Sequence, residues 1–103
     1  NKVEISAVHY LPEDITAGDY VNFTVTTNNV GTQNEEELRV SVIIYELGVK
    51  KSTSYFDLDK DEKTTRNIAF QIPVDAQAGE YLVKINASND KVHETAYRLL
   101  SIN

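Results

Sequence analysis

The chain has 103 residues, which is enough for one domain with a single hydrophobic core. It contains no cysteine, so neither a disulfide framework nor a cysteine-ligated metal site supports the fold. Sixteen acidic residues against ten basic ones give a net charge of −6, which argues against nucleic acid and an anionic membrane surface as partners. No apolar run is long enough to span a bilayer, so we expect no direct membrane insertion.

Apolar and polar residues alternate with a period of two along most of the chain, which predicts β-strands. Turn-forming residues cluster at 17–19 and 28–31 and separate these runs. No stretch has the length and apolar periodicity of an amphipathic helix. The predicted strands cover residues 3–7, 21–25, 38–45, 49–57, 68–72, 81–85 and 92–102.

Seven short strands separated by regular turn signals predict a sandwich of two sheets. Tyr81 follows Gly79 at the start of the sixth strand, directly after a corner, which is where immunoglobulin-like sandwiches place a tyrosine corner. We therefore predict an all-β, seven-stranded antiparallel immunoglobulin/fibronectin-III-like β-sandwich over residues 1–103, with Tyr81 as its structural tyrosine corner. An ordinary buried strand tyrosine is the alternative for Tyr81.

Two of the predicted strands place apolar side chains on both faces. Ile43 and Tyr45 point away from the core side of the third strand, so we expect that face to be partly covered. In the last strand Tyr97 and Leu99 favour one face and Leu100 the other. A β-bulge near these residues would reconcile the two parities, so we expect one there.

The chain also contains an ordered series of turn and strand motifs. The series runs through Pro12, Ala17-Gly18-Asp19, Val21-x-Phe23-x-Val25, Asn29-Val30-Gly31, Phe70-x-Ile72-Pro73 and Ala78-Gly79-Glu80-Tyr81-x-Val83-x-Ile85. In this order the motifs resemble the CARDB family, the cell-adhesion-related domain of bacteria and archaea, and related modules of archaeal S-layer-like proteins. The resemblance implies a seven-stranded sandwich, tandem copies in a long surface protein, and an adhesion, spacing or assembly role without catalytic residues.

The sequence has neither a signal peptide nor any methionine. We therefore expect a segment excised from a larger protein, with the targeting signal and the anchor outside it. Together with the resemblance, this predicts an extracellular or cell-surface location.

Two Asn-x-Ser/Thr triplets are candidate glycosylation sites. They are Asn22-Phe23-Thr24 and Asn86-Ala87-Ser88, and strand parity places Asn22 and Asn86 on outward faces, where an acceptor must lie. Such triplets also arise by chance in a chain rich in Asn, Ser and Thr, so the alternative is two unmodified asparagines.

An acidic segment provides a candidate calcium loop. Asp57, Asp59 and Asp61 alternate as the first ligands of an EF-hand loop do. However, Glu62 stands where that loop needs glycine, and Ile68 stands where it needs a bidentate glutamate. A solvated turn explains the pattern better, so we predict no metal site and keep the three aspartates as the alternative.

Other polar groups give weaker signals. His9 and His93 fall in the first and last strands, but two histidines without a third ligand or an orienting carboxylate make a poor metal site. The run Glu35-Glu36-Glu37 predicts a solvated loop. No serine has a visible base and orienter, and the loop carboxylates lie on sequence expected to be exposed, so we predict no catalytic residues, no cofactor and no enzymatic activity.

The predicted function is therefore a non-catalytic structural or adhesion module of a cell-surface or secreted protein. Its expected partners are neighbouring domains of the same chain or other surface proteins, and the isolated domain is expected to be monomeric. One alternative is a carbohydrate-binding module, which needs exposed aromatic rings to stack on sugars. The chain has no tryptophan, and the ring candidates are Tyr10, Tyr20, Tyr45, Tyr55 and Tyr97.

A further alternative is an accessory module that supports an adjacent enzyme. Such a module needs an exposed apolar patch for docking, and Ile43 and Tyr45 are the candidates for it. The residues alone leave these alternatives open.

Overall fold

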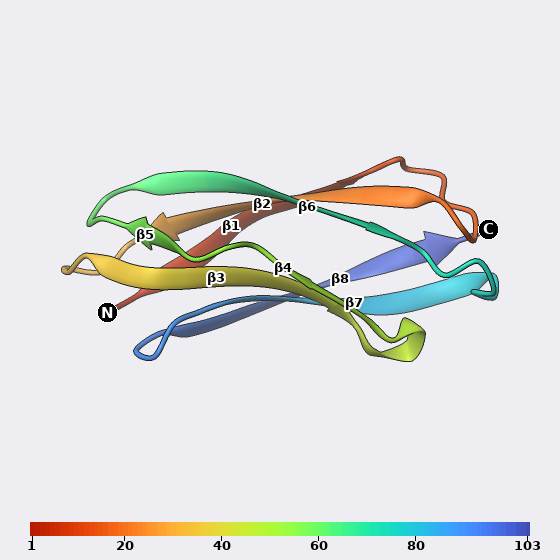
Figure 1. The fold of residues 1–103 in the computed structure, drawn as a ribbon. Helices are drawn as coiled ribbons and strands as arrows, with labels where there is room; N and C mark the ends of the chain where they lie inside the picture. The colour runs from red at the N-terminus through yellow and green to blue at the C-terminus, as the bar shows by residue number, and fades with distance from the viewer.

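The computed structural model describes all residues 1–103 and arranges them in two facing antiparallel sheets (Figure 1). The first sheet has the order β1-β2-β6, with bounds Val3–Leu11, Tyr20–Asn29 and Lys63–Gln71. The second has the order β4-β3-β7-β8, with bounds Val49–Ser52, Glu35–Ile44, Gly79–Ser88 and His93–Ile102. The short β5 (Phe56–Leu58) pairs with the beginning of β3.

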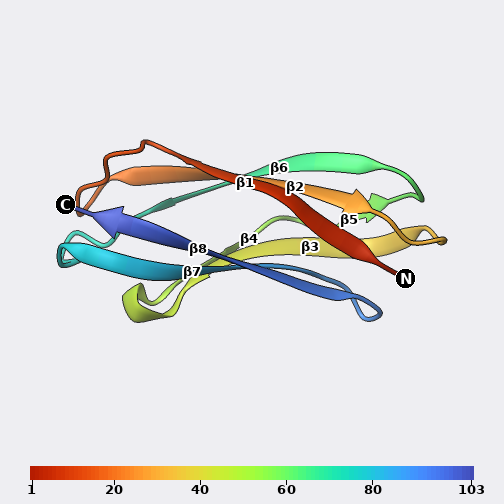
Figure 2. The same cartoon turned by 180° about the vertical axis from the view of Figure 1, so that it is seen from behind.

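The prediction of an all-β fold made of two antiparallel sheets is confirmed. The only helical element of the chain is the 3₁₀ turn η1 (Tyr45–Leu47). A helix with the length and apolarity needed to span a membrane is absent from the chain. The two chain ends lie at opposite ends of the long axis of the molecule, as seen from the front in Figure 1 and from behind in Figure 2.

The number of strands is eight instead of the predicted seven. The single strand expected over 49–57 is divided into β4 and β5. At Thr53 a side-chain oxygen, instead of a backbone carbonyl, accepts the hydrogen bond from β3, and the regular ladder stops there. The Val40 N–H donates to Thr53 Oγ1 at 3.1 Å, and the Thr53 N–H donates to the Val40 carbonyl at 2.8 Å. After these two hydrogen bonds the chain pairs again with β3, now with its beginning, and forms β5.

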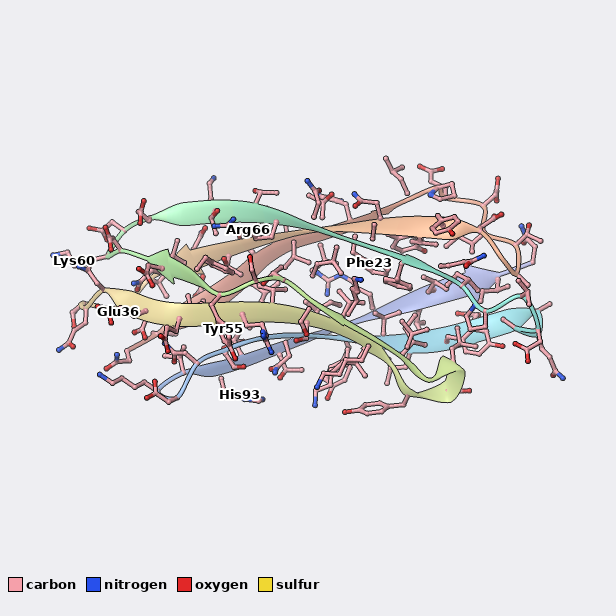
Figure 3. The ribbon with its side chains drawn as sticks, in the orientation of Figure 1. Phe23, Glu36, Tyr55, Lys60, Arg66 and His93 are labelled. Atoms are coloured by element: carbon pink, nitrogen blue, oxygen red, sulfur yellow. The ribbon has the colours of Figure 1, made fainter.

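The main core lies between the sheets and consists mostly of the predicted inward-facing valines and isoleucines. Phe23 is fully buried there (Figure 3), and its ring centroid lies 5.7 Å from that of Phe70 and 5.3 Å from that of Tyr10. These contacts join β1, β2 and β6 over the second sheet. A separate, smaller cluster comprises Val3, Leu38, Leu58 and Val92.

The predicted loop at 35–37 is wrong, because these residues begin β3, although Glu36 and Glu37 are exposed as predicted. Glu35 is only 1% exposed. Its two carboxylate oxygens accept hydrogen bonds from the side-chain amides of Asn1 at 2.8 Å and Asn89 at 3.0 Å. Those bonds satisfy the buried carboxylate and connect the N-terminus, β3 and the β7–β8 turn.

The predicted bulge near Leu100 is also wrong. Strands β7 and β8 pair without a register shift from Gly79–Ile102 to Ser88–His93. Tyr97 and Leu99 therefore remain on the outer face and are exposed, while Leu100 is buried. The mixed parity in the sequence marks an apolar surface and not an irregular strand.

Candidate functional site

The outer face of the second sheet brings together side chains from β4, β3, β7 and β8. Arg39 lies opposite Ser88, and Ser41 lies between Ser52 and Asn86. Further along the same strands the outward residues are different: Lys84 lies between Ile43 and Tyr97, and Leu82 lies opposite Leu99. The face is thus polar in one half and largely apolar in the other.

The polar half contains a groove of about 460 Å³. We call it the polar groove, and it is lined by Glu37, Arg39, Ser41, Lys50, Ser52, Tyr55, Asn86, Ser88, Asn89 and Asp90. Other surface hollows of the chain have similar volumes, so the chemistry of its lining is what distinguishes this groove. Its lining is almost entirely polar, and Tyr55 supplies the aromatic ring.

Tyr55 comes from the segment between β4 and β5, and its ring reaches the same outer side of the sheet as His93 (Figure 3). The Arg39 guanidinium carbon lies 4.1 Å from the ring centroid, which is a cation–π contact. The ring is nevertheless 60% exposed. Arg39 Nε is buried and has no hydrogen-bond partner.

The apolar half carries four apolar side chains around the outward Lys84, and we call these four the apolar patch: Ile43, Leu82, Tyr97 and Leu99. Leu82 is 52% exposed, Tyr97 54% and Leu99 60%. Ile43 is half-buried. Tyr45 is more exposed but belongs to η1, beyond the end of β3. From the sequence, Ile43 and Tyr45 were the candidates for such a patch, and Leu82, Tyr97 and Leu99 were not anticipated.

The two sequon asparagines lie in the middle of strands on the outer faces of different sheets. Asn22 in β2 donates to Thr24 Oγ1 and to Asn67 Oδ1, both at 3.4 Å. Asn86 in β7 lines the polar groove and accepts a hydrogen bond from Thr95 Oγ1 at 3.2 Å. Both side chains are half-buried, and their glycosylation stays a prediction.

The three aspartates of the candidate calcium loop have separate surroundings. Asp57 belongs to β5, and its Oδ1 accepts the Glu37 N–H at 3.1 Å. Asp59 and Asp61 lie in the following turn, which is closed by a hydrogen bond from the Asp59 N–H to Glu62 Oε1 at 2.7 Å. Nowhere does the chain gather three His, Cys, Asp or Glu side chains in a way that could hold a metal ion.

The two histidines are not brought together. His9 pairs with Thr24 on the outer face of the first sheet, whereas His93 pairs with Ser88 on the outer face of the second. The rings therefore point away from each other across the sandwich. Tyr81, in contrast, has a specific contact: its hydroxyl donates to the Gln77 carbonyl at 2.6 Å.

Comparison with known families decides where this sandwich belongs. The family model described as glycosyl hydrolase family 66 matches residues 14–102, which is most of the chain. The chain belongs to glycosyl hydrolase family 66. Among curated proteins none matches the sequence.

Solved structures share the fold at low sequence identity. An alkylpurine DNA glycosylase, AlkC, of Pseudomonas fluorescens bound to abasic-site DNA has a TM-score of 0.70 at 13% identity, over 98% of this chain and 30% of that one. A family 123 glycoside hydrolase of Clostridium perfringens has a TM-score of 0.57 at 12% identity, over 85% of this chain and 21% of that one. The β-glucosidase EmGH1 of Erythrobacter marinus has a TM-score of 0.64 at 9% identity, over 99% of this chain and 15% of that one. The chain therefore spans less than a third of each of these proteins.

The family 66 match overturns the resemblance to CARDB and, with it, the predicted adhesion and S-layer role. It also overturns the prediction of a protein without enzymatic activity, because the family is one of hydrolases. The motifs that suggested CARDB are turn and strand signals that many sandwiches share, so they specify a fold and carry no information about function.

Proposed function

We propose that this chain is the enzyme-supporting β-sandwich domain of a glycoside hydrolase, and that it packs against the catalytic domain of the same protein. The family match over residues 14–102 carries the proposal. Two glycoside hydrolases with this fold support it, because the sandwich corresponds to only 21% and 15% of their chains. The whole protein hydrolyses glycosidic bonds in this proposal, a reaction that a pair of Asp or Glu carboxylates performs in most such enzymes.

We further propose that the sandwich is of the fibronectin-III-like type. Three strands, β1, β2 and β6, face the remaining sheet of β4, β3, β7 and β8, which is the division of an immunoglobulin-like fold with an added edge strand. The Tyr81 hydroxyl bond to Gln77, four residues upstream, has the geometry of a tyrosine corner at the turn into β7.

The apolar patch is the surface that we assign to docking. Leu82 and Leu99 face each other across β7 and β8, and both expose more than half of their side chains. Tyr97, directly beside them, adds an amphipathic ring of the kind that is enriched in interfaces. Covering these side chains removes apolar area from water, and the catalytic domain is the occupant to which we commit.

The test uses the intact glycoside hydrolase that contains this chain. The double variant Leu82→Glu, Leu99→Glu is expected to lower the stability of the intact enzyme by about 2 kcal/mol or more, because two carboxylates replace apolar contacts at a covered interface. The same double variant in the 103-residue chain alone is expected to lose less than about 1 kcal/mol, since both positions are exposed there and only the repulsion between two facing carboxylates remains. Calorimetry of both proteins and kcat/KM of the intact enzyme are the measurements.

Leu11→Glu is the matched control, because Leu11 is also an exposed leucine but lies on β1 in the other sheet. This control is expected to leave the intact enzyme unchanged. If the double variant leaves both the melting temperature and kcat/KM of the intact enzyme unchanged, the patch does not support the enzyme and the proposal fails.

A further inference from the structure

We infer that the polar groove binds a neutral oligosaccharide. The inference goes beyond the supporting role, because it rests on the groove and not on the apolar patch. The two surfaces occupy different halves of the same face, so one of them can fail its test without affecting the other.

The charges of the groove point to a neutral ligand. Glu37 and Asp90 supply two negative groups, and Arg39 and Lys50 supply two positive ones. The charged side chains therefore balance, and a phosphorylated or polycarboxylated ligand finds no excess of positive charge. A strongly cationic ligand is disfavoured for the same reason.

The neutral side chains of the groove match a ligand rich in hydroxyl groups. Three serines and two asparagines line it. The Asn89 side chain is already saturated, because its N–H groups donate to Glu35 and to the Glu36 carbonyl, and its Oδ1 accepts the Lys91 and Val92 N–H groups. Ser41 is only 7% exposed and bonds Ser52 at 2.7 Å. The capacity that remains lies on Ser52, on Ser88 and on the second N–H of Asn86, whose first N–H donates to Ser88 Oγ at 3.5 Å. Sugar hydroxyls likewise donate and accept, and they fit such a surface.

Tyr55 supplies the apolar contact that a sugar ring needs. The faces of a pyranose carry C–H groups that stack on aromatic rings, and Tyr55 is the exposed ring of this groove. Arg39 holds the ring at 4.1 Å from its guanidinium carbon, so less side-chain freedom is lost when a ligand binds.

The outer face of the first sheet differs from the groove in the position of its aromatic ring. That face is also rich in threonine and asparagine, and on both faces the polar side chains bond to each other: Thr24 bonds Asn67 at 3.0 Å, and Ser41 bonds Ser52 at 2.7 Å. The exposed ring of the first sheet, Tyr20, lies at the beginning of β2, whereas Tyr55 lines the groove itself.

The test titrates the ¹⁵N-labelled 103-residue chain, made in a host that adds no N-glycans, with maltohexaose, isomaltohexaose and cellohexaose. Binding of at least one of them is expected with a roughly millimolar dissociation constant, since a single ring and a shallow groove bind weakly. The amide signals that shift are expected to belong to the polar groove and above all to Ser52, Asn86 and Ser88. Polygalacturonate, an anionic counterpart, is expected to bind more weakly than the best neutral probe.

Tyr55→Ala is expected to weaken binding by about tenfold, which corresponds to losing one ring-stacking contact. Tyr55→Phe keeps the ring and is expected to change the affinity by less than about twofold. Tyr45→Ala is the matched control, because Tyr45 is 72% exposed and lies outside the groove. Both positions are exposed, so neither variant is expected to affect folding.

Three results would overturn the inference. They are an absence of shifts with all three neutral probes, shifts confined to residues outside the groove, and an equal loss of affinity in Tyr45→Ala and Tyr55→Ala. Stronger binding of polygalacturonate than of every neutral probe would overturn the assignment of a neutral ligand.

Discussion

The two lengthwise halves of this sandwich are built in different ways. The half near the N-terminus adds buried polar groups to a small apolar cluster of four residues. The buried Glu35 carboxylate bonds two asparagine side chains, and Asn29 donates to the Gln33 and Leu58 carbonyls at 2.8 and 2.9 Å. The half near the C-terminus is held by apolar packing, with Phe23 and Phe70 stacked between the sheets. We call these the polar half and the apolar half.

The outer face of the second sheet follows the same division. The polar groove lies in the polar half and the apolar patch in the apolar half, although both use the same strands β3, β7 and β8 or their turns. The same set of strands can therefore present two surfaces with different chemistry, because the outward positions are free of the constraint of the core.

The largest expected loss of stability comes from removing a buried ring at the centre of the apolar half. Phe23→Ala is expected to lower the free energy of unfolding by about 3 to 5 kcal/mol, because it removes a fully buried ring and leaves a cavity between the sheets. Urea unfolding measures the loss. Tyr20→Ala, on the same strand but exposed, is the control and is expected to change stability by less than about 0.5 kcal/mol. A loss below about 1 kcal/mol for Phe23→Ala would mean that packing does not dominate in this half.

The polar half is tested at Glu35. Glu35→Ala is expected to cost roughly 2 to 3 kcal/mol, because the side-chain amide of Asn1 loses its buried carboxylate partner and that of Asn89 loses one of two acceptors. The neighbouring variant Glu36→Ala, at an exposed position, is expected to be neutral within about 0.5 kcal/mol. Equal effects of the two variants in urea unfolding would contradict a structural role for the carboxylate.

A smaller loss of stability is expected at the turn into β7, at the end of the apolar half. Tyr81→Phe removes the hydroxyl that donates to the Gln77 carbonyl at 2.6 Å while keeping the ring. We expect a loss of about 1 kcal/mol, which is the usual net contribution of one hydrogen bond. Thermal unfolding measures this loss. Unchanged stability would exclude a tyrosine corner.

The smallest effect on stability is expected at the sequons, where the readout is mass. Protein from a glycosylating host is expected to gain a glycan mass that Asn22→Gln removes, since Asn22 lies on the outer face of the first sheet. A glycan on Asn86 would fill the polar groove and prevent an oligosaccharide from binding. Mass spectrometry of Asn22→Gln and Asn86→Gln separates the two sites, and native protein without added mass would show that neither triplet is used.

The sequence predicted a large part of the fold and little of the site. Alternation of Val21, Phe23 and Val25 with polar residues was enough to predict a buried strand face, because side chains of a strand alternate between two environments. It did not predict the division of 49–57 into two strands, because this depends on Thr53 meeting Val40 across the sheet. Glu35 was misread as solvated because its two amide partners lie 34 and 54 residues away along the chain.

The sequence by itself determined an all-β sandwich with a valine- and isoleucine-rich core. Its motifs suggested the wrong family, and comparison with the family model established membership of glycosyl hydrolase family 66. Only the tertiary structure decided which outward residues become neighbours. Arg39, Tyr55 and Asn86 form one groove, and Leu82 and Leu99 one patch, because the pairing of β3, β7 and β8 aligns them. The physical reason is that burial restricts inward positions to apolar residues, so that the sequence pattern predicts them. The chemistry of an outward position depends instead on its cross-strand neighbours, which only the strand register brings together.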